Sequence, residues 1–186
     1  MRFSLMFFSS GEQGGATVTY NHLLDFARRA DASSWTRVWL PERHFSDFGA
    51  VHPNPAVLGA AVAAQTRRIR IAAGSVVAPL HDPIRIAEEW AIVDNLSDGR
   101  VDLSLAAGWR AEDFALAPAS YAERMNILAK SAVDVRRLWR GESLARKDGT
   151  GTTHSLRARP KPRQPELPLW ITAARSSTSF ELAGTL

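Results

Sequence analysis

The sequence contains no cysteine. This absence excludes disulfide bonds, zinc sites built from thiolates and cysteine nucleophiles. It also gives no reason to place the protein in an oxidising compartment, so we expect a cytoplasmic location. No apolar run approaches the ~20 residues that a membrane-spanning helix needs, and we therefore expect no membrane role. Residues 1–15 lack a long apolar region and a small-residue cleavage site, and we interpret their apolar part as a first strand.

Lysine is rare, since three of the 23 basic residues are lysines, and the arginines are scattered among acidic residues. The net charge of +4 is compatible with a nucleic-acid partner. However, the densest basic stretch, residues 157–163, is interrupted by two prolines and is typical of a linker. The sequence has no stripe of basic residues interleaved with aromatic ones. We therefore expect no nucleic-acid partner.

The remaining composition is typical of one soluble globular domain. The chain has 186 residues, of which 45% are hydrophobic and 23% are charged. Domains commonly hold ~100–200 residues, so we expect residues 1–186 to form a single domain.

Strand-like and helix-like segments alternate along this domain. Short apolar runs typical of buried strands occur at residues 2–8, 34–40, 68–78, 100–108 and 167–174. Several of the intervening segments repeat their apolar residues at helical spacing. Because parallel neighbours need a crossover connection, this alternation predicts an α/β fold with a parallel sheet. The candidates are an open doubly wound sheet and a (β/α)8 barrel of the TIM type.

Three of the expected helices begin with a capping signal. Asn54 and Asp82 each precede a proline, and an accepting side chain followed by proline is typical of a first helical turn. Ser120 and Glu123 have the spacing of a capping box. This spacing predicts a long helix that begins after Ser120 and continues to Trp139.

Residues 141–166 interrupt the alternation with three prolines and many polar residues. They predict an inserted hairpin or a crossing loop. A complete barrel typically needs ~250 residues, whereas this chain stops within its fifth helix after about five βα units. We therefore expect an incomplete N-terminal portion of a barrel. It is either a fragment of a longer protein or a half-barrel that pairs with another chain to cover its edges.

Ligands of parallel α/β folds bind at the carboxyl ends of the strands. In this chain those ends bring small and polar residues to one rim, in the segments 8–10, 42–44, 74–75, 106–109 and 174–177. The sequence therefore predicts a site at this rim.

His44 has three interpretations. It is an ordinary loop or core histidine, or it forms an acid–base site together with Glu42. A metal site built from Glu42, His44 and His52 is the third, although the two histidines are far apart on an irregular loop. Spacing alone leaves all three open.

Two further features of the rim have both a structural and a functional interpretation. Gly74 is either a packing glycine or part of the site. The run Ser176–Thr178 is either a helix cap or a phosphate site, because free N–H groups and the helix dipole favour an anion and Arg175 adds a positive charge.

Three stretches together resemble the bacterial luciferase-like, FMN-dependent monooxygenase family. They are WLPERHF (39–45), the block 72–109, and PLWITAARSSTSFELAG (168–184). The middle block is the most specific, since it holds a strand, a P-L-H-x-P turn, an A-E-E helix and an L-S-x-G-R entry in the family's order. Within the family the chain is most similar to the branch attached to, or encoded beside, nonribosomal peptide and polyketide synthases.

The resemblance implies a (β/α)8 barrel that holds reduced FMN at the strand ends, where O2 forms a flavin C4a-hydroperoxide. The protein shields this species and presents an organic substrate, small or carrier-tethered, in natural-product biosynthesis. The resemblance also implies a separate NAD(P)H-dependent flavin reductase that supplies the reduced FMN. A homodimer, or membership of a larger synthase, is the expected assembly.

The resemblance also assigns residues. His44 matches the family histidine near the flavin peroxide, where it acts as a base or a hydrogen-bond donor, and Glu42 orients its neighbours or is structural. Gly74 and Ser75 match a site behind the isoalloxazine ring that often has a non-proline cis peptide. The small side chains beside the ring are those of Ala106 and Ala107. The phosphate-gripping segment comprises Arg175, Ser176, Thr178 and Ser179.

Two other functions compete with this one. A catalytically silent half-barrel that serves as a structural or subunit-interface module is the first. A metal-dependent barrel hydrolase is the second.

Overall fold

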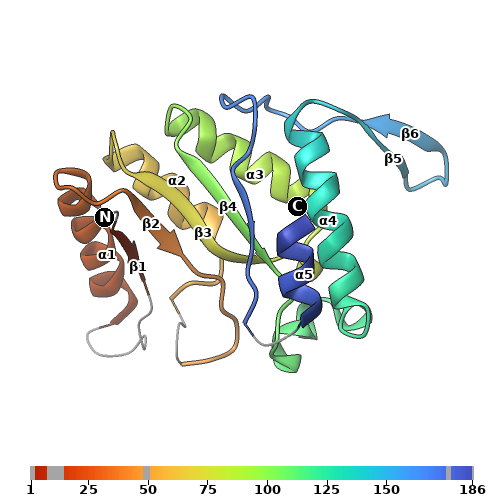
Figure 1. Cartoon of the computed structure of the whole chain (residues 1–186), viewed down its shortest axis with the longest axis horizontal. Helices are drawn as coiled ribbons and strands as arrows, with labels where there is room; N and C mark the ends of the chain where they lie inside the picture. Colours follow the sequence, from red (N-terminus) through yellow and green to blue (C-terminus); the bar gives the residue numbers. More distant parts are fainter. Residues whose placement is uncertain (1–2, 8–14, 48–50, 175–176, 186) are drawn as a thin grey trace.

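The computed structural model describes residues 3–7, 15–47, 51–174 and 177–185. Five strands form one parallel sheet (Figure 1), namely β1 (Ser4–Met6), β2 (Arg37–Leu40), β3 (Arg70–Val77), β4 (Val101–Ala106) and β7 (Leu169–Ile171). Their order in the sheet is their order along the chain. A doubly wound sheet reverses this order at a switch point. The sequence left open a doubly wound sheet and a barrel. Because the strand order is not reversed, the barrel-type arrangement is confirmed.

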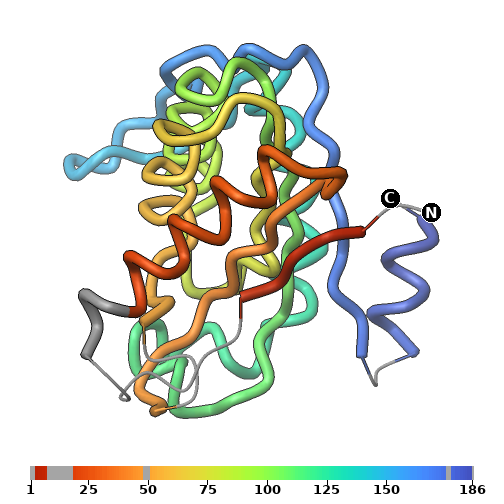
Figure 2. Tube along the Cα trace, turned by 90° about the vertical axis from the view of Figure 1, so that its left-hand side faces the viewer, coloured from red at the N-terminus to blue at the C-terminus, as the bar shows by residue number. Residues whose placement is uncertain are grey.

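Helices connect and follow these strands. They are α1 (Gly15–Asp31), α2 (Pro55–Gln65), α3 (Pro83–Leu96), α4 (Arg124–Trp139) and α5 (Ser177–Thr185). Helices α1 to α4 cover one side of the sheet, as Figure 2 shows, because successive right-handed crossovers without a reversal put the connecting helices on the same side; α5, which follows the last strand, lies on the other side. Among the described residues, no helix is both long enough and apolar enough to cross a membrane.

The side of the sheet that faces these helices is the hydrophobic core. Alternate strand residues point to this side and are fully buried, including Val38, Leu40, Ile71, Leu103 and Leu105. The indoles of Trp90 on α3 and Trp139 on α4 pack against them. This alternation explains why the apolar runs of the sequence were reliable predictors of strands.

The opposite side of the sheet is polar near the start of the strands. Asp102 is buried between Arg37 and Arg70, and both guanidinium groups hydrogen-bond to its carboxylate. Further along, the rings of Trp39 and Trp170 meet edge to face with centroids 6.3 Å apart. This side therefore presents charged and aromatic groups instead of a second apolar core.

Two of the three predicted caps are confirmed. The Asn54 side chain accepts hydrogen bonds from the N–H groups of Ala56 and Val57 at 2.9 and 3.1 Å. The Asp82 carboxylate accepts one from the N–H of Ile84 at 2.8 Å. Helices α2 and α3 begin directly after these residues.

The predicted capping box of Ser120 and Glu123 is wrong. Helix α4 begins at Arg124, and Ser120 ends a short 3-10 helix, η3 (Pro118–Ser120), instead. The chain is held in tight turns there because the rings of Phe114 and Tyr121 pack with centroids 4.9 Å apart. The Glu123 carboxylate accepts a hydrogen bond from the side chain of Asn126 at 2.7 Å.

Residues 141–166 contain a two-stranded antiparallel sheet. Its strands are β5 (Leu144–Lys147) and β6 (Thr153–Leu156), which project from the end of α4 (Figure 1). A hairpin was one of the two alternatives for this range. Its status as an insertion within a single domain of residues 1–186 stays a prediction.

Candidate functional site

The rim predicted from the sequence exists as one edge of the sheet. Because the strands are parallel, their carboxyl ends lie along the same edge, at the bottom of Figure 1. Glu42 and His44 follow β2, Gly74 and Ser75 lie within β3, and Ala106 ends β4. The predicted residues of three different strands therefore meet at one rim.

Glu42 is the centre of this rim. Its side chain is fully buried, and Oε1 accepts hydrogen bonds from Nε2 of His44 at 2.9 Å and Nε2 of His81 at 2.7 Å. Oε2 accepts a third from the N–H of Val77 at 2.7 Å. Burial alone would raise the pKa of Glu42, but these hydrogen bonds and the charge of His81 hold that pKa below its ordinary value. Glu42 is therefore an ionised carboxylate inside the protein.

His44 is positioned by this carboxylate. Its side chain is 12% exposed, and its backbone carbonyl accepts a hydrogen bond from Nη1 of Arg110 at 3.3 Å. An ionised carboxylate is an acceptor, so Nε2 of His44 must be the donor. In the neutral ring Nδ1 is then the acceptor nitrogen, and it is the atom at which His44 takes up a proton.

His81 is a site residue to which the sequence analysis assigned no role. It follows the 3-10 helix η1 (Ala78–Leu80) and precedes α3. Burial lowers the pKa of His81, but the hydrogen bond and negative charge of Glu42, with a smaller contribution from Glu89, raise it above its ordinary value. The P-L-H-x-P turn was visible in the sequence. Only the fold, however, brings its histidine to the carboxylate of Glu42, which is 39 positions earlier in the chain.

The peptide bond between Gly74 and Ser75 is cis, as the resemblance implied. A Cβ at Gly74 would lie 3.1 Å from Cβ of Trp39, so this glycine is needed for packing as well as for its place in the rim. A register shift in β3 beside this bond leaves Ser75 outside the regular ladder with β4.

Three hydroxyl groups form a cluster beside this peptide. Oγ1 of Thr172 contacts Oγ of Ser75 and lies 2.7 Å from Oγ of Ser104. These side chains come from the ends of β3, β4 and β7. Sequence reasoning missed Ser104 and Thr172, because each falls within an apolar run that was interpreted as a buried strand. Ala106 and Ala107 are partly buried at the end of β4.

The predicted phosphate segment is described in part. Arg175 and Ser176 lie outside the described residues. Thr178 is exposed and Ser179 is buried in the first turn of α5, which begins at the same edge of the sheet (Figure 1). The role assigned to this segment stays a prediction.

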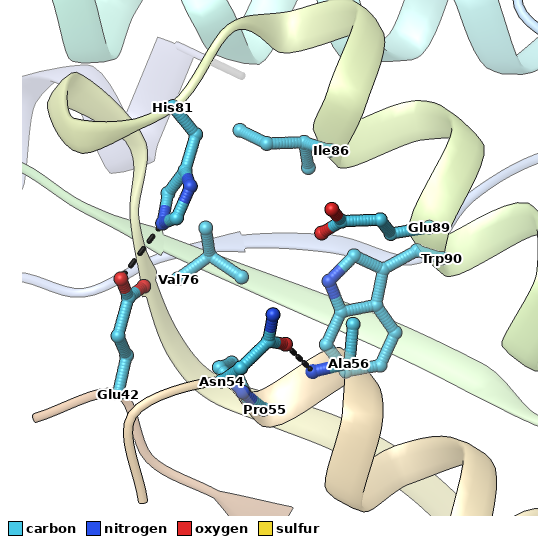
Figure 3. A pocket seen from close by; sticks show the side chains of 9 residues that line it. All are labelled: Glu42, Asn54, Pro55, Ala56, Val76, His81, Ile86, Glu89 and Trp90. Atoms are coloured by element: carbon cyan, nitrogen blue, oxygen red, sulfur yellow. Dashed lines mark hydrogen bonds and ion pairs between the residues drawn. The ribbon is translucent and has the colours of Figure 1, made fainter.

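Two cavities bear on where a cofactor could bind, one at the rim and one away from it. The first, of about 10 Å³, lies behind Glu42 and His81 and is lined by Asn54, Glu89 and Trp90 among others (Figure 3). This is room for about one water molecule and not for a flavin ring. A flavin would therefore have to bind at the open rim.

The second cavity, of about 250 Å³, lies beyond the C-terminal end of α4. We call it the basic hollow, after its lining residues Arg140, Arg157, Arg159 and Lys161. It is at the opposite end of α4 from the rim.

The alternative metal site is not assembled. Within the described ranges, no group of three or more histidine, aspartate or glutamate side chains has an arrangement that could hold a metal ion. His52 is buried, and its carbonyl accepts a hydrogen bond from the N–H of Arg43 at 2.9 Å. It does not join Glu42 and His44 in a ligand set.

Comparison with known proteins agrees with this fold. The family model described as "Luciferase-like monooxygenase" matches residues 1–186. The oxygenase component of a flavin-dependent trigonelline monooxygenase from Acinetobacter baylyi is 28% identical over 98% of this chain and 51% of its own length. The 4-hydroxyprotoasukamycin monooxygenase of Streptomyces nodosus subsp. asukaensis is 30% identical over 87% of this chain and 44% of its own length.

Solved structures agree as well. Monooxygenase RslO1 from Streptomyces bottropensis superposes with a TM-score of 0.88 and 27% identity over 98% of this chain and 56% of its own. The oxygenating constituent of 3,6-diketocamphane monooxygenase from Pseudomonas putida, solved with FMN, has a TM-score of 0.82 and 22% identity. The superposition covers 99% of this chain and 55% of the other protein's length, and the similarity supports the fold.

The chain belongs to the luciferase-like monooxygenase family. This confirms both the resemblance and the barrel-type fold predicted from the sequence. The chain spans about half the length of the curated relatives it matches.

Proposed function

We propose that this chain forms the rim of an FMN-dependent monooxygenase. In this proposal reduced FMN binds at the carboxyl ends of β3, β4 and β7, and O2 oxidises an organic substrate there. Reduced flavin supplies the two electrons of the reaction, so that one oxygen atom enters the substrate and the other leaves as water. The observation that carries the proposal is the ionised Glu42 bound to His44 on the same edge as a cluster of hydroxyl groups.

The residues at the rim suit a flavin. A planar ring needs small neighbours and a few polar groups that fix its orientation. Ala106 and Ala107 are small, and the hydroxyls of Ser75, Ser104 and Thr172 both donate and accept hydrogen bonds. Thr178 and Ser179 lie at the start of α5, where backbone N–H groups and the helix dipole favour a phosphate.

Within this site His44 has the role of proton acceptor. The hydrogen bond to Glu42 holds its Nε2, which leaves Nδ1 to accept a proton from a reacting group. A positioned base of this kind typically contributes 10²–10⁴-fold to a rate. Glu42 acts through His44 and is therefore a positioning residue.

The proposal includes partners. The name "oxygenase component" of the Acinetobacter relative supports a separate NAD(P)H-dependent flavin reductase as the source of reduced FMN. The Streptomyces relative, named for 4-hydroxyprotoasukamycin, supports an organic substrate from natural-product biosynthesis. A homodimer, or a place within a larger synthase, would cover the sheet edges that the present chain exposes.

Flavin binding tests the proposal. Titration of FMN fluorescence with the protein should give saturable quenching, and FAD should compete more weakly because the chain has no dinucleotide-binding glycine loop. A matched variant, Thr172→Val, should weaken the binding. The absence of quenching with an intact family monooxygenase as positive control would reject this function. It would favour a catalytically silent structural or subunit-interface module.

A further inference from the structure

The carboxylate of Glu42 is shared by two imidazoles. Oε1 accepts from His44 and from His81, while Oε2 is occupied by the N–H of Val77. Since an ionised carboxylate is an acceptor, both Nε2 atoms must carry hydrogen, and the shared oxygen fixes the tautomer of both rings. The remaining variable is how many of the two rings are charged.

Charge balance favours a single charged ring. With both rings neutral, the cluster has one negative charge, carried by the fully buried Glu42 side chain. One additional proton brings the net charge to zero, which is the least costly state for a buried group. A second proton would place two positive rings against one carboxylate oxygen, where they repel each other.

The surroundings decide which ring takes the proton. His81 has the shorter hydrogen bond to Glu42 and the more exposed side chain, 29% against 12% for His44. Figure 3 shows the carboxylate of Glu89 pointing from α3 into the cavity beside His81. Two negative groups therefore face the ring of His81, which accounts for its raised pKa.

The neighbours of His44 have the opposite sign. The guanidinium of Arg110 approaches its carbonyl from the segment after β4, and Arg43 precedes it in the chain. Two acidic groups, Glu112 and Asp113, contact the guanidinium of Arg110 at 3.7 and 3.9 Å. They offset the charge of Arg110 and do not bind the ring of His44.

We propose that His81 is a positioning residue that carries the positive charge of this cluster and thereby keeps His44 a neutral Nε2–H tautomer. His81 and Glu42 together form a neutral pair, and His44 donates to it without gaining a charge. Nδ1 of His44 is then the acceptor nitrogen at neutral pH. The use of that nitrogen as a base rests on the proposed function, whereas the protonation states of the rings do not.

Nitrogen NMR of the histidines tests this proposal directly. In the native chain, labelled with ¹⁵N-histidine at pH 7, we expect His81 to show two protonated ring nitrogens. His44 should show a protonated Nε2 and a bare Nδ1. A charged His44 beside a neutral His81, or an Nδ1–H tautomer at His44, would overturn the proposal. No flavin is present in this experiment, so a failure of flavin binding does not affect the result.

A variant sharpens the test. His81→Gln keeps an amide donor for Glu42 and removes the charge, so the proton should pass to His44 and raise its ratio of charged to neutral ring about tenfold at pH 7. The matched control is His154→Gln, which removes an exposed histidine bonded to Asp148 on the β5–β6 hairpin. It should leave His44 unchanged. If the ratio of charged to neutral His44 ring is also unchanged in His81→Gln, the proposal is wrong. If that variant does not fold, the spectrum of the native chain decides whether His81 carries the charge.

Discussion

Two carboxylates of this chain bind histidines with nearly the same local geometry. Glu42 at the rim accepts from His44 and His81 at 2.9 and 2.7 Å, and Asp148 on the hairpin accepts from His154 at 2.8 Å. Each also accepts backbone N–H hydrogen bonds. The difference is burial, since the Glu42 side chain is 0% exposed and that of Asp148 is 39% exposed.

The comparison shows that hydrogen-bond geometry alone does not make a functional pair. The hydroxyl and N–H of Thr150, together with His154, lower the pKa of Asp148 to about 2, yet water screens its charge from the rest of the chain. The Glu42 side chain is buried, so its charge is screened less by solvent and determines the tautomers of two rings. Substitutions at the rim should therefore have large effects and those on the hairpin small ones.

The largest expected effect is that of His44→Ala on oxygenation. Loss of the base should reduce the rate by 10²–10⁴-fold in an oxygenation assay with reduced FMN, while FMN affinity is largely kept. His154→Ala on the hairpin should leave the rate unchanged. A collapse of FMN affinity with normal turnover per bound flavin would show that His44 binds the cofactor instead.

Glu42→Gln should be the most destabilising rim substitution. It leaves His81 without its counter-ion in a buried site and should lower the free energy of unfolding by about 3 kcal/mol, as measured in urea. Asp148→Asn, the matched change on the hairpin, should leave the unfolding midpoint within error. Equal losses in both variants would mean that burial does not distinguish the two carboxylates.

The pH dependence of stability should separate His81 from other rim residues. Because the folded pKa of His81 is raised, its contribution is fully present below the ordinary value of 6.5 and is lost as pH rises through the folded value. The pKa of Glu42 is lowered, so its contribution is present above 4.5 and is lost as pH falls through the folded value.

The difference in unfolding free energy between the native chain and His81→Gln should consequently be largest between pH 4.5 and 6.5. It should decline toward alkaline pH. Urea unfolding at several pH values measures it. A difference that grows with pH would show that His81 is neutral in the folded chain.

The smallest rim effect should be that of Thr172→Val. The substitution preserves shape and removes the hydroxyl that contacts both Ser75 and Ser104. If Thr172 bonds the flavin ring as proposed, loss of that hydrogen bond should weaken FMN affinity about tenfold in a fluorescence titration. Thr150→Val, which removes a hydroxyl from the hairpin, should not alter the affinity.

The fold was largely predictable from local patterns. Apolar runs indicated all five parallel strands, and Asn54 and Asp82 indicated two helix starts, because these signals depend on residues close together in the chain. The start of α4 was not predictable. The packing of Phe114 on Tyr121 holds the chain in turns there and overrides the capping-box spacing.

The site was predictable in part for the same reason. Glu42 and His44 lie two residues apart, and their pairing follows from one short motif. The contacts to His81 and Thr172 join residues 39 and 97 positions apart, which only the assembled sheet brings together. Hydroxyls within apolar runs also gave no sign that they face the rim.

Mapping the FMN site by NMR tests the central claim most directly. On addition of FMN, the methyl signals of Ala106 and Ala107 and the ring signals of His44 should shift, while Ala158 in the basic hollow should not. This result would place the flavin at the carboxyl ends of the strands. Shifts confined to Ala158 and its basic neighbours, with the rim signals unmoved, would contradict it.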